Sequence, residues 1–502
     1  MTGIAAFRER IAGLMRELPD ERRALFTDPQ RQQGMLARLA KVLEASHQVA
    51  IRTLADLVAD EHPDIAAELR AALGEVDADA EQYSAPEFGF ALYWLHEAPD
   101  RIVAAAPGAA EIPLVVDLLR RTLPAAYMTA DQTGRLFAAT AARPLRPVWI
   151  AADGTVYGTA QYEQLDIGWT RALANLVSTL WHRDFVRPFP TRKDFAPVPL
   201  EANAQGCVKI AIVGDWGGGN ALARGVMETI AELGPDYVIH LGDVYYAGTD
   251  GKGSPPGEEQ DFLVDFWRRY GPAEAGRCFT LNSNHEMYSG ARGYFRVALP
   301  NPMFAGQEGY SYFALAFGEW VIAGFDSAYY ASSLTLFLHG DLGDGKDPQY
   351  DFLKKVARLG RKTILMCHHN PISYKGGESG RHCGQSPLWE EVTRTISPDY
   401  WYWGHLHLGA VYNGSSAAGA VKARCVGHGC IPFGVPRGLA GDARVDWFSD
   451  TVFDDPGERA YPEGAQRAVN GFAMITLTED GISEEFFRAG STTPVYRIPG
   501  AG

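Results

Sequence analysis

Side chains of metal-binding type stand just past the ends of several predicted strands. They are Asp215, Asp243, Asn284, the adjacent His368 and His369, and the pair His405 and His407. In open α/β sheets ligands bind at the carboxyl ends of the strands, so we expect these side chains to converge there. Carboxylate, amide and imidazole groups suit divalent or trivalent first-row metals rather than sulfur-seeking sites. An aspartate that bridges two cations would explain so many ligands, and two metals about 3.5–4 Å apart form a clamp for in-line phosphoryl transfer.

The strands that would position these residues are short apolar runs. Residues 208–213 end at Gly214-Asp215, and residues 237–241 end at Gly242-Asp243, with a helical stretch between them. Apolar runs in the order strand, helix, strand indicate a buried parallel pair. Further strands are expected at 278–282, 311–317, 319–325 and 362–367, and a closing hairpin at 471–487.

The first two hundred residues have a different character. Residues 1 to about 130 are rich in Ala, Leu, Arg and Glu, and their apolar residues recur at helical spacing. A hairpin is expected around 148–158 and a helix over 169–182, followed by a proline-rich stretch up to about residue 205. No residue group in the N-terminal part has the spacing of a chemical site, which favours a helical accessory domain.

Composition excludes several classes of partner. The chain of 502 residues has 46 Lys and Arg against 61 Asp and Glu, a net charge of −15, so non-specific binding to nucleic acid or anionic membrane is not expected. No apolar stretch reaches the roughly 18 residues of a membrane helix, and charges are spread through the N-terminus, unlike a secretory signal. The six cysteines include no CxxC pair. We therefore expect a cytoplasmic protein without a disulfide framework.

Five motifs in order carry a family resemblance. They are GDWG (214–217), GDVYY (242–246), SNHE (283–286), MCHHNP (366–371) and GHLH (404–407). This set resembles the calcineurin-like metallophosphoesterases, and within them most closely the purple acid phosphatases. The usual first motif is Asp-x-His, but Gly217 occupies its third position, and Tyr246 matches the tyrosine of the GDxxY motif that replaces that ligand. The resemblance covers roughly residues 206–488 and nothing in 1–200.

The resemblance implies a ligand set for two metal ions. Asp215, Tyr246 and His407 would hold iron(III), and Asp243 would bridge both ions. Asn284, His405 and one of the paired histidines would hold a divalent iron, zinc or manganese ion. His285 would contact phosphate or protonate the leaving group, and His382 falls near the place of a further catalytic histidine. Lys375, Arg381 and Arg437 are candidate contacts for a charged substrate.

Two positions depart from the family pattern or leave a choice open. Ser283 stands where the third motif usually has glycine. Members with one histidine read His-x-Pro, which points to His369, whereas members with His-His-Pro point to His368. We favour His368 as the ligand and keep His369 as the alternative.

The implied fold is α/β, a four-layer αββα sandwich with an N-terminal mainly helical accessory domain. The expected division is 1–145, accessory domain; 146–205, hairpin, helix and proline-rich linker; 206–490, metallophosphoesterase domain; and 491–502, a tail. The expected reaction is hydrolysis of a small-molecule phosphate monoester by metal-bound hydroxide, with a phosphodiesterase as the alternative. A pseudoenzyme is less favoured, and the helical region is a candidate docking site for a protein partner.

Overall fold

The computed structural model describes residues 149–150, 156–157, 161–162, 168–182, 184–192, 195–251, 257–331, 337–377, 384–432, 439–449 and 469–500. The accessory domain expected over 1–145 lies outside these residues, as do His382, Arg381 and Arg437. The chain is divided into two compact units between Asp184 and Phe185. The first unit contains the expected hairpin, in which β1 (Trp149–Ile150) pairs with β2 (Val156–Tyr157), and the expected helix α9 (Trp169–His182).

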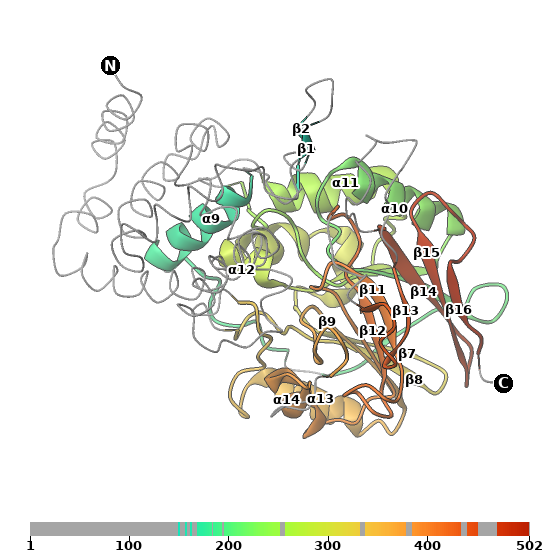
Figure 1. Ribbon diagram of the computed structural model, residues 1–502. Helices are drawn as coiled ribbons and strands as arrows, with labels where there is room; N and C mark the ends of the chain where they lie inside the picture. The colour runs from blue at the N-terminus through green and yellow to red at the C-terminus, as the bar shows by residue number, and fades with distance from the viewer. Residues whose placement is uncertain are drawn as a thin grey trace, which may run out of the picture. The chain divides into compact units, whose positions relative to one another are not determined.

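Two sheets form in the described part of the second unit (Figure 1). The larger sheet has eight strands in the order β13-β11-β12-β10-β9-β8-β7-β3. In chain order these are β3 (Val198–Pro199), β7 (Phe313–Phe317), β8 (Trp320–Gly324), β9 (Lys362–Cys367), β10 (Tyr400–Trp403), β11 (Gly409–Tyr412), β12 (Lys422–Val426) and β13 (Val445–Phe448). Strands β8, β9, β10 and β12 run parallel to one another, which brings their carboxyl ends to one edge.

The smaller sheet has six strands among the described residues, in the order β16-β15-β14-β4-β5-β6. In chain order they are β4 (Val208–Val213), β5 (Tyr237–His240), β6 (Cys278–Thr280), β14 (Gly471–Leu477), β15 (Ile482–Arg488) and β16 (Tyr496–Ile498). Strands β4, β5 and β6 are parallel, and β14 and β15 form the predicted closing hairpin. Because β3 and β16 belong to these sheets, the sheets extend beyond the expected limits of 206–490 at both ends.

Helices connect the parallel strands. Those described in the second unit are α10 (Ala221–Leu233), α11 (Asp265–Tyr270), α12 (Asn284–Tyr288), α13 (Pro348–Ala357) and α14 (Pro387–Thr393), with the shorter helical turns η1 (Glu259–Val264), η2 (Tyr294–Ala298) and η3 (Pro302–Gln307). Helix α10 begins where the Asn220 side chain accepts the Ala223 N–H and ends at Gly234, whose φ is 60°. The local sequence thus sets both ends of the helix that links β4 to β5.

The main core lies between the two sheets. Ile210, Ile239 and Ile475 of the smaller sheet and Ile322 and Ile364 of the larger sheet belong to one buried cluster. Crossover helices must pack on the faces of the sheets that this core leaves, α10 on the smaller sheet and α13, which contacts β8, on the larger. The expected four-layer αββα arrangement is therefore confirmed for the second unit. No described helix is both long and apolar enough to cross a membrane.

Candidate metal centre

The residues expected to bind metal follow the carboxyl ends of strands in both sheets. Asp215 follows β4, Asp243 follows β5, and Asn284 begins α12 after β6. The larger sheet adds His368 and His369 after β9, and His405 and His407 after β10. Backbone N–H groups join the sheets here: Gly214 N–H donates to the Val426 carbonyl at 2.9 Å, and His405 N–H donates to the side-chain oxygen Oδ2 of Asp215 at 2.8 Å. The two strand edges therefore open onto one common site.

The backbone turns sharply at four of these residues. The φ angles of Asp215, Asp243, His405 and His407 are 54°, 78°, 70° and 39°. Such left-handed conformations cost on the order of 1–3 kcal/mol each at residues other than glycine, and they cluster at functional sites. Each turn bends the chain away from its strand, so that side chains which a continued strand would separate face one centre.

The first group of ligand atoms surrounds a tyrosine hydroxyl. The hydroxyl of Tyr245 lies 2.9 Å from Asp243 Oδ2, 3.2 Å from His407 Nε2 and 3.4 Å from Asp215 Oδ1. His407 Nε2 is also 3.5 Å from Asp215 Oδ1. Tyr246 is the tyrosine that the GDxxY motif predicts as a ligand, whereas the hydroxyl among these atoms belongs to its neighbour Tyr245. We call Asp215, Asp243, Tyr245 and His407 the first cluster.

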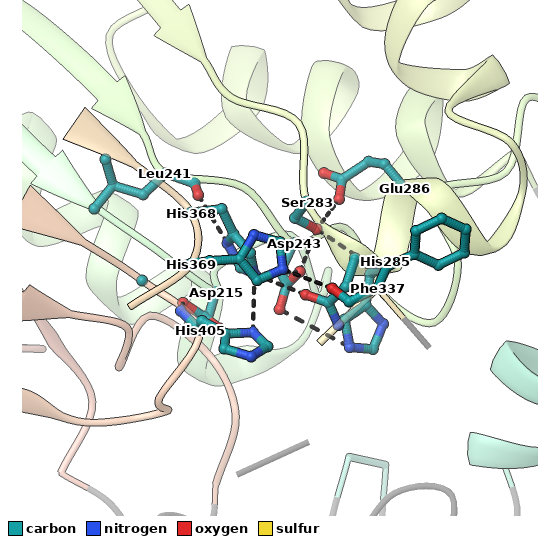
Figure 2. A network of polar contacts seen from close by, with 12 residues as sticks. Asp215, Leu241, Asp243, Ser283, His285, Glu286, Phe337, His368, His369 and His405 are labelled. Atoms are coloured by element: carbon teal, nitrogen blue, oxygen red, sulfur yellow. Dashed lines mark hydrogen bonds and ion pairs between the residues drawn. The ribbon is translucent and has the colours of Figure 1, made fainter. Parts of the chain in front are cut away.

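The second group of ligand atoms surrounds His368 Nε2. This nitrogen lies 2.8 Å from Asn284 Oδ1, 3.2 Å from His405 Nδ1 and 3.3 Å from Asp243 Oδ1. We call Asp243, Asn284, His368 and His405 the second cluster. Figure 2 shows His368, His405 and Asp243 turned toward one another. Asp243 thus presents Oδ2 to the first cluster and Oδ1 to the second, the position of a bridging ligand.

The paired histidines have different surroundings. His368 donates from Nδ1 to the Leu241 carbonyl at 2.9 Å, which leaves Nε2 facing the second cluster. A nitrogen of His369 also lies within 4.8 Å of the histidine nitrogens of this cluster. However, His369 Nε2 donates to the Phe337 carbonyl at 2.7 Å (Figure 2), and its Nδ1 is 2.9 Å from the Ser327 hydroxyl. Because protein atoms engage both ring nitrogens of His369, the geometry favours His368 as the ligand.

Burial sets the charge of the histidines in both clusters. Burial lowers the pKa of His407 to about 3, and it lowers the pKa of His368 and, strongly, that of His405. Neutral imidazole is the form that binds metal. Burial alone would raise the pKa of Asp243, but His368, His285 and the Ser283 hydroxyl outweigh it and lower that pKa. At neutral pH the centre therefore offers a carboxylate among neutral imidazoles.

Ser283, the residue just before α12, supports the metal centre through its side chain. It caps the helix by accepting the His285 N–H, and its hydroxyl contacts Asp243 Oδ1 and Glu286 Oε2 (Figure 2). Burial and the adjacent Asp243 raise the pKa of Glu286 to about 8, so this carboxyl is mainly protonated at neutral pH. A single hydroxyl can then bond two carboxyl groups. The serine that replaces the family glycine therefore makes contacts of its own to the bridging aspartate.

His285 lies beside the clusters rather than within them. Its Nδ1 donates to the Tyr246 carbonyl at 2.7 Å, and its Nε2 is 3.9 Å from Asp243 Oδ2. The ring sits between those of Tyr245 and Tyr288, with centroids 4.5 and 4.9 Å away. The bond from Nδ1 fixes the tautomer and directs Nε2 toward the clusters, which suits a group that exchanges a proton with a bound ligand.

Gly217 shows why the first motif has no histidine here. A Cβ at this position would lie 2.7 Å from the Asp243 carbonyl oxygen and 2.8 Å from Val244 Cα. The backbone also pairs directly, since Gly217 N–H donates to the Asp243 carbonyl at 3.0 Å. The loop that carries Asp243 and Tyr245 thus fills the space that a side chain at 217 would need.

Of the other predicted residues, Lys375 lies in the described part of the chain, whereas His382, Arg381 and Arg437 do not. Lys375 is half-buried in a turn after β9, and its charge acts together with the stronger effect of Arg444 to lower the pKa of Asp442 to about 2. Tyr245, whose hydroxyl lies in the first cluster, was not among the predicted residues and is adjacent to the predicted Tyr246. The sequence pattern does not show which of two neighbouring tyrosines in a turn points toward the aspartates, so Tyr245 could not be identified from it.

A comparison with known families agrees with these motifs. Residues 208–409 match the calcineurin-like phosphoesterase family model, and that span includes every residue of both clusters. No curated protein sequence matches the chain significantly.

Several solved structures resemble part of the chain. A purple acid phosphatase from yellow lupin (Lupinus luteus) seeds is 15% identical with a TM-score of 0.39, over 60% of this chain and 54% of its own. A dimetal phosphatase from Danio rerio is 12% identical with a TM-score of 0.35, over 58% of this chain and 98% of its own. GAP50 of Plasmodium, described as the anchor in the inner membrane complex, is 14% identical with a TM-score of 0.37, over 58% and 88%. Residues 208–409 therefore form a calcineurin-like phosphoesterase domain.

Proposed function

We propose that this chain is a dinuclear-metal phosphoesterase that hydrolyses a phosphate monoester. The observation that supports the proposal best is the position of Asp243, whose two carboxylate oxygens lie in different ligand clusters. A carboxylate that joins two ligand groups is what a pair of adjacent cations requires, and a metal pair suits phosphoryl transfer.

The hydrogen-bonding capacity of the second cluster supports a cation there. His368 uses its one proton at Nδ1, so Nε2 is an acceptor, and it faces Asn284 Oδ1 and Asp243 Oδ1, which are acceptors too. The Asn284 amide nitrogen donates to the Tyr288 hydroxyl at 2.9 Å, which keeps Oδ1 turned toward His368. Buried acceptors that face one another at these distances repel unless a cation lies among them.

The two clusters define which residues would hold each ion. Asp215, Asp243, Tyr245 and His407 would hold the first, and Asp243, Asn284, His368 and His405 the second. For the first ion we propose iron(III), because only a strongly Lewis-acidic ion holds tyrosinate against the phenol pKa of about 10. The second ion would be divalent iron, zinc or manganese. When bound, the pair would neutralise phosphate charge and lower the pKa of water.

The protein's own contribution to the reaction would come from His285. Its Nε2 faces the clusters, and Tyr246 fixes its tautomer through the bond from Nδ1. In the protonated form His285 can donate a hydrogen bond to a phosphate oxygen or a proton to the departing alcohol. General acids of this kind contribute about 10²–10⁴-fold to rate. His382 is proposed as a further catalytic histidine near the leaving group.

The substrate class that we propose is a phosphate monoester. A phosphate diester is the alternative, since both chemistries use the same metal pair. Lys375, Arg381 and Arg437 are proposed as contacts for charged substrate groups. The N-terminal region is proposed to dock a protein partner.

Metal analysis with visible absorption tests the metal assignment. We expect two metals per chain including iron, and a purple tyrosinate-to-iron absorption that Tyr245→Phe abolishes and Tyr246→Phe retains. Loss of colour in Tyr246→Phe but not in Tyr245→Phe would indicate that Tyr246 is the ligand. A colourless protein with two zinc or manganese ions would contradict the assignment of iron(III) but would remain compatible with the phosphoesterase function. A protein that takes up no metal would refute the proposal.

Activity measurements test the reaction itself. We expect p-nitrophenyl phosphate to be hydrolysed with a higher kcat/KM than bis(p-nitrophenyl) phosphate, and the reverse order would favour the diester alternative. Asp243→Asn, which removes the charge at nearly constant shape, should lower kcat/KM by more than about 100-fold. A variant that keeps near-wild-type activity with both metals bound would contradict a bridging role.

A further inference from the structure

We propose that Glu258 is a positioning residue for His285 and for the loop after β5, and this inference rests on the proposed phosphoesterase function. Glu258 is separated from the loop residues it contacts by about ten positions and lies outside all five motifs. Its side chain is buried, with only 1% of the residue exposed. A buried carboxylate needs partners that balance its charge, and here backbone N–H groups supply them.

The carboxylate of Glu258 accepts hydrogen bonds from three residues of the loop. Oε1 accepts the Tyr246 N–H at 2.8 Å, and Oε2 accepts the N–H groups of Ala247 at 2.9 Å and Thr249 at 3.3 Å. In return, the Glu258 N–H donates to the Thr249 hydroxyl at 3.1 Å. Charge-assisted bonds of this kind are stronger than neutral ones, so they fix the path of residues 246–249.

This loop holds two elements of the site. Tyr245 precedes the bound segment, and its hydroxyl lies in the first cluster. The Tyr246 carbonyl accepts the proton of His285 Nδ1 at 2.7 Å. Glu258 holds the N–H of the same residue whose carbonyl orients His285, so a shift of Tyr246 would turn the imidazole. The Nε2 atom of His285 would then no longer face the position of a bound phosphate.

The contacts explain why an acid rather than an amide is required. Both oxygens of Glu258 accept bonds from N–H groups, whereas a glutamine offers one oxygen and an NH₂ group. In Glu258→Gln that NH₂ would face a backbone N–H and leave a buried donor without an acceptor, which destabilises the loop. The loop would relieve this by moving.

Glu259 provides a matched control. It is fully buried beside Glu258, but neither of its carboxyl oxygens has a hydrogen-bond partner in the part of the chain that the structure describes. Burial, Glu286 and Glu258 raise its pKa well above the ordinary value, so it is neutral. Glu259→Gln therefore exchanges one neutral group for another of the same shape and leaves the loop bonds intact.

Hydrogen exchange of the metal-loaded full chain tests the structural part. In Glu258→Gln we expect the peptide that covers residues 245–250 to exchange at least about tenfold faster than in Glu259→Gln, because the loop opens more easily without its bonds to Glu258. A tenfold change corresponds to about 1.4 kcal/mol in the free energy of loop opening. Equal exchange in the two variants would overturn the proposal. This readout does not depend on catalysis, so it decides the role of Glu258 even if the chain proves to have no phosphatase activity.

Leaving-group dependence tests the link to His285. Alcohols that leave poorly need protonation, so Glu258→Gln should lower kcat for phenyl phosphate about tenfold or more, and kcat for 2,4-dinitrophenyl phosphate much less. KM and metal content should stay near those of Glu259→Gln. An equal loss on both substrates, or a loss of metal, would mean a merely structural role and contradict the proposal. An inactive wild-type chain would instead refute the proposed function.

Discussion

At the scale of single residues, the adjacent histidines His368 and His369 make different contacts. His368 points its Nε2 into the second cluster, while His369 bonds Ser327 and the Phe337 carbonyl. The Phe337 backbone itself adopts a φ of 57°, which places that carbonyl in front of His369. His369 is therefore built into the wall of the site, and His368 into its centre.

This difference predicts opposite outcomes for the two histidines. His368→Asn should lose the second metal, because Nε2 is the atom nearest to Asn284, His405 and Asp243. His369→Asn should keep both metals and lose about 1–3 kcal/mol of unfolding free energy, since its hydrogen-bond partners are left buried and unpaired. Metal analysis and urea unfolding of each variant check both statements. Metal loss on changing His369 but not His368 would reverse the assignment.

At the scale of elements, a buried ion pair joins the two sheets. Arg424 of β12 donates to Glu484 of β15 through Nε at 2.6 Å and through a second nitrogen at 2.8 Å, and the Tyr402 hydroxyl donates to the same carboxylate. Both side chains are about 95% buried or more. Since the larger sheet supplies the histidines and the smaller sheet the aspartates, this pair helps to fix the sheets whose edges form the site.

Breaking that pair should be costly. Glu484→Leu leaves the Arg424 charge buried without its partner, so we expect a loss of about 3–5 kcal/mol in the free energy of unfolding. The double variant Arg424→Leu/Glu484→Leu should be more stable than the single one, because no buried charge remains. Lys355→Ala, which removes an exposed pair with Asp351, should change stability far less. Urea unfolding measures all three, and a single variant as stable as wild type would disprove the role.

At the scale of the whole molecule, buried neutral histidines make stability depend on pH. Burial lowers the pKa of both His240 and His428 to about 3, from 6.5 for an exposed histidine. Between pH 6.5 and 3 the unfolded chain therefore binds protons that the folded chain does not. The folded state loses stability as the pH falls through this window, by up to about 1.4 kcal/mol per pH unit for each histidine.

His428→Gln tests this account at a residue outside both clusters. We expect the wild-type free energy of unfolding to decrease from pH 7 to pH 4.5, and the variant to decrease with a shallower slope. Urea titrations at several pH values provide the slopes, and the absolute stability of the variant does not affect the comparison. Parallel slopes would show that His428 does not take up a proton on unfolding.

Much of the fold followed from local patterns. Apolar runs located β4, β5 and β9, and the predicted helix over 169–182 coincides with α9. Side chains and backbone in a strand or helix repeat with a fixed period, so short-range sequence is sufficient there. The expectation that polar residues after the strands would share one edge also rests on a local rule, because parallel strands end on the same side.

The sequence by itself determined that carboxylate, amide and imidazole side chains follow the ends of several strands of an α/β fold. Only the tertiary structure showed that the Tyr245 hydroxyl lies in the first cluster, that His368 Nε2 lies in the second, and that Glu258 bonds the loop. The physical reason is that Tyr245 and His368 lie in turns that follow strands, and that Glu258 reaches the loop from another segment. Side-chain direction there follows no period, and it is set by hydrogen bonds between segments that are distant in the sequence.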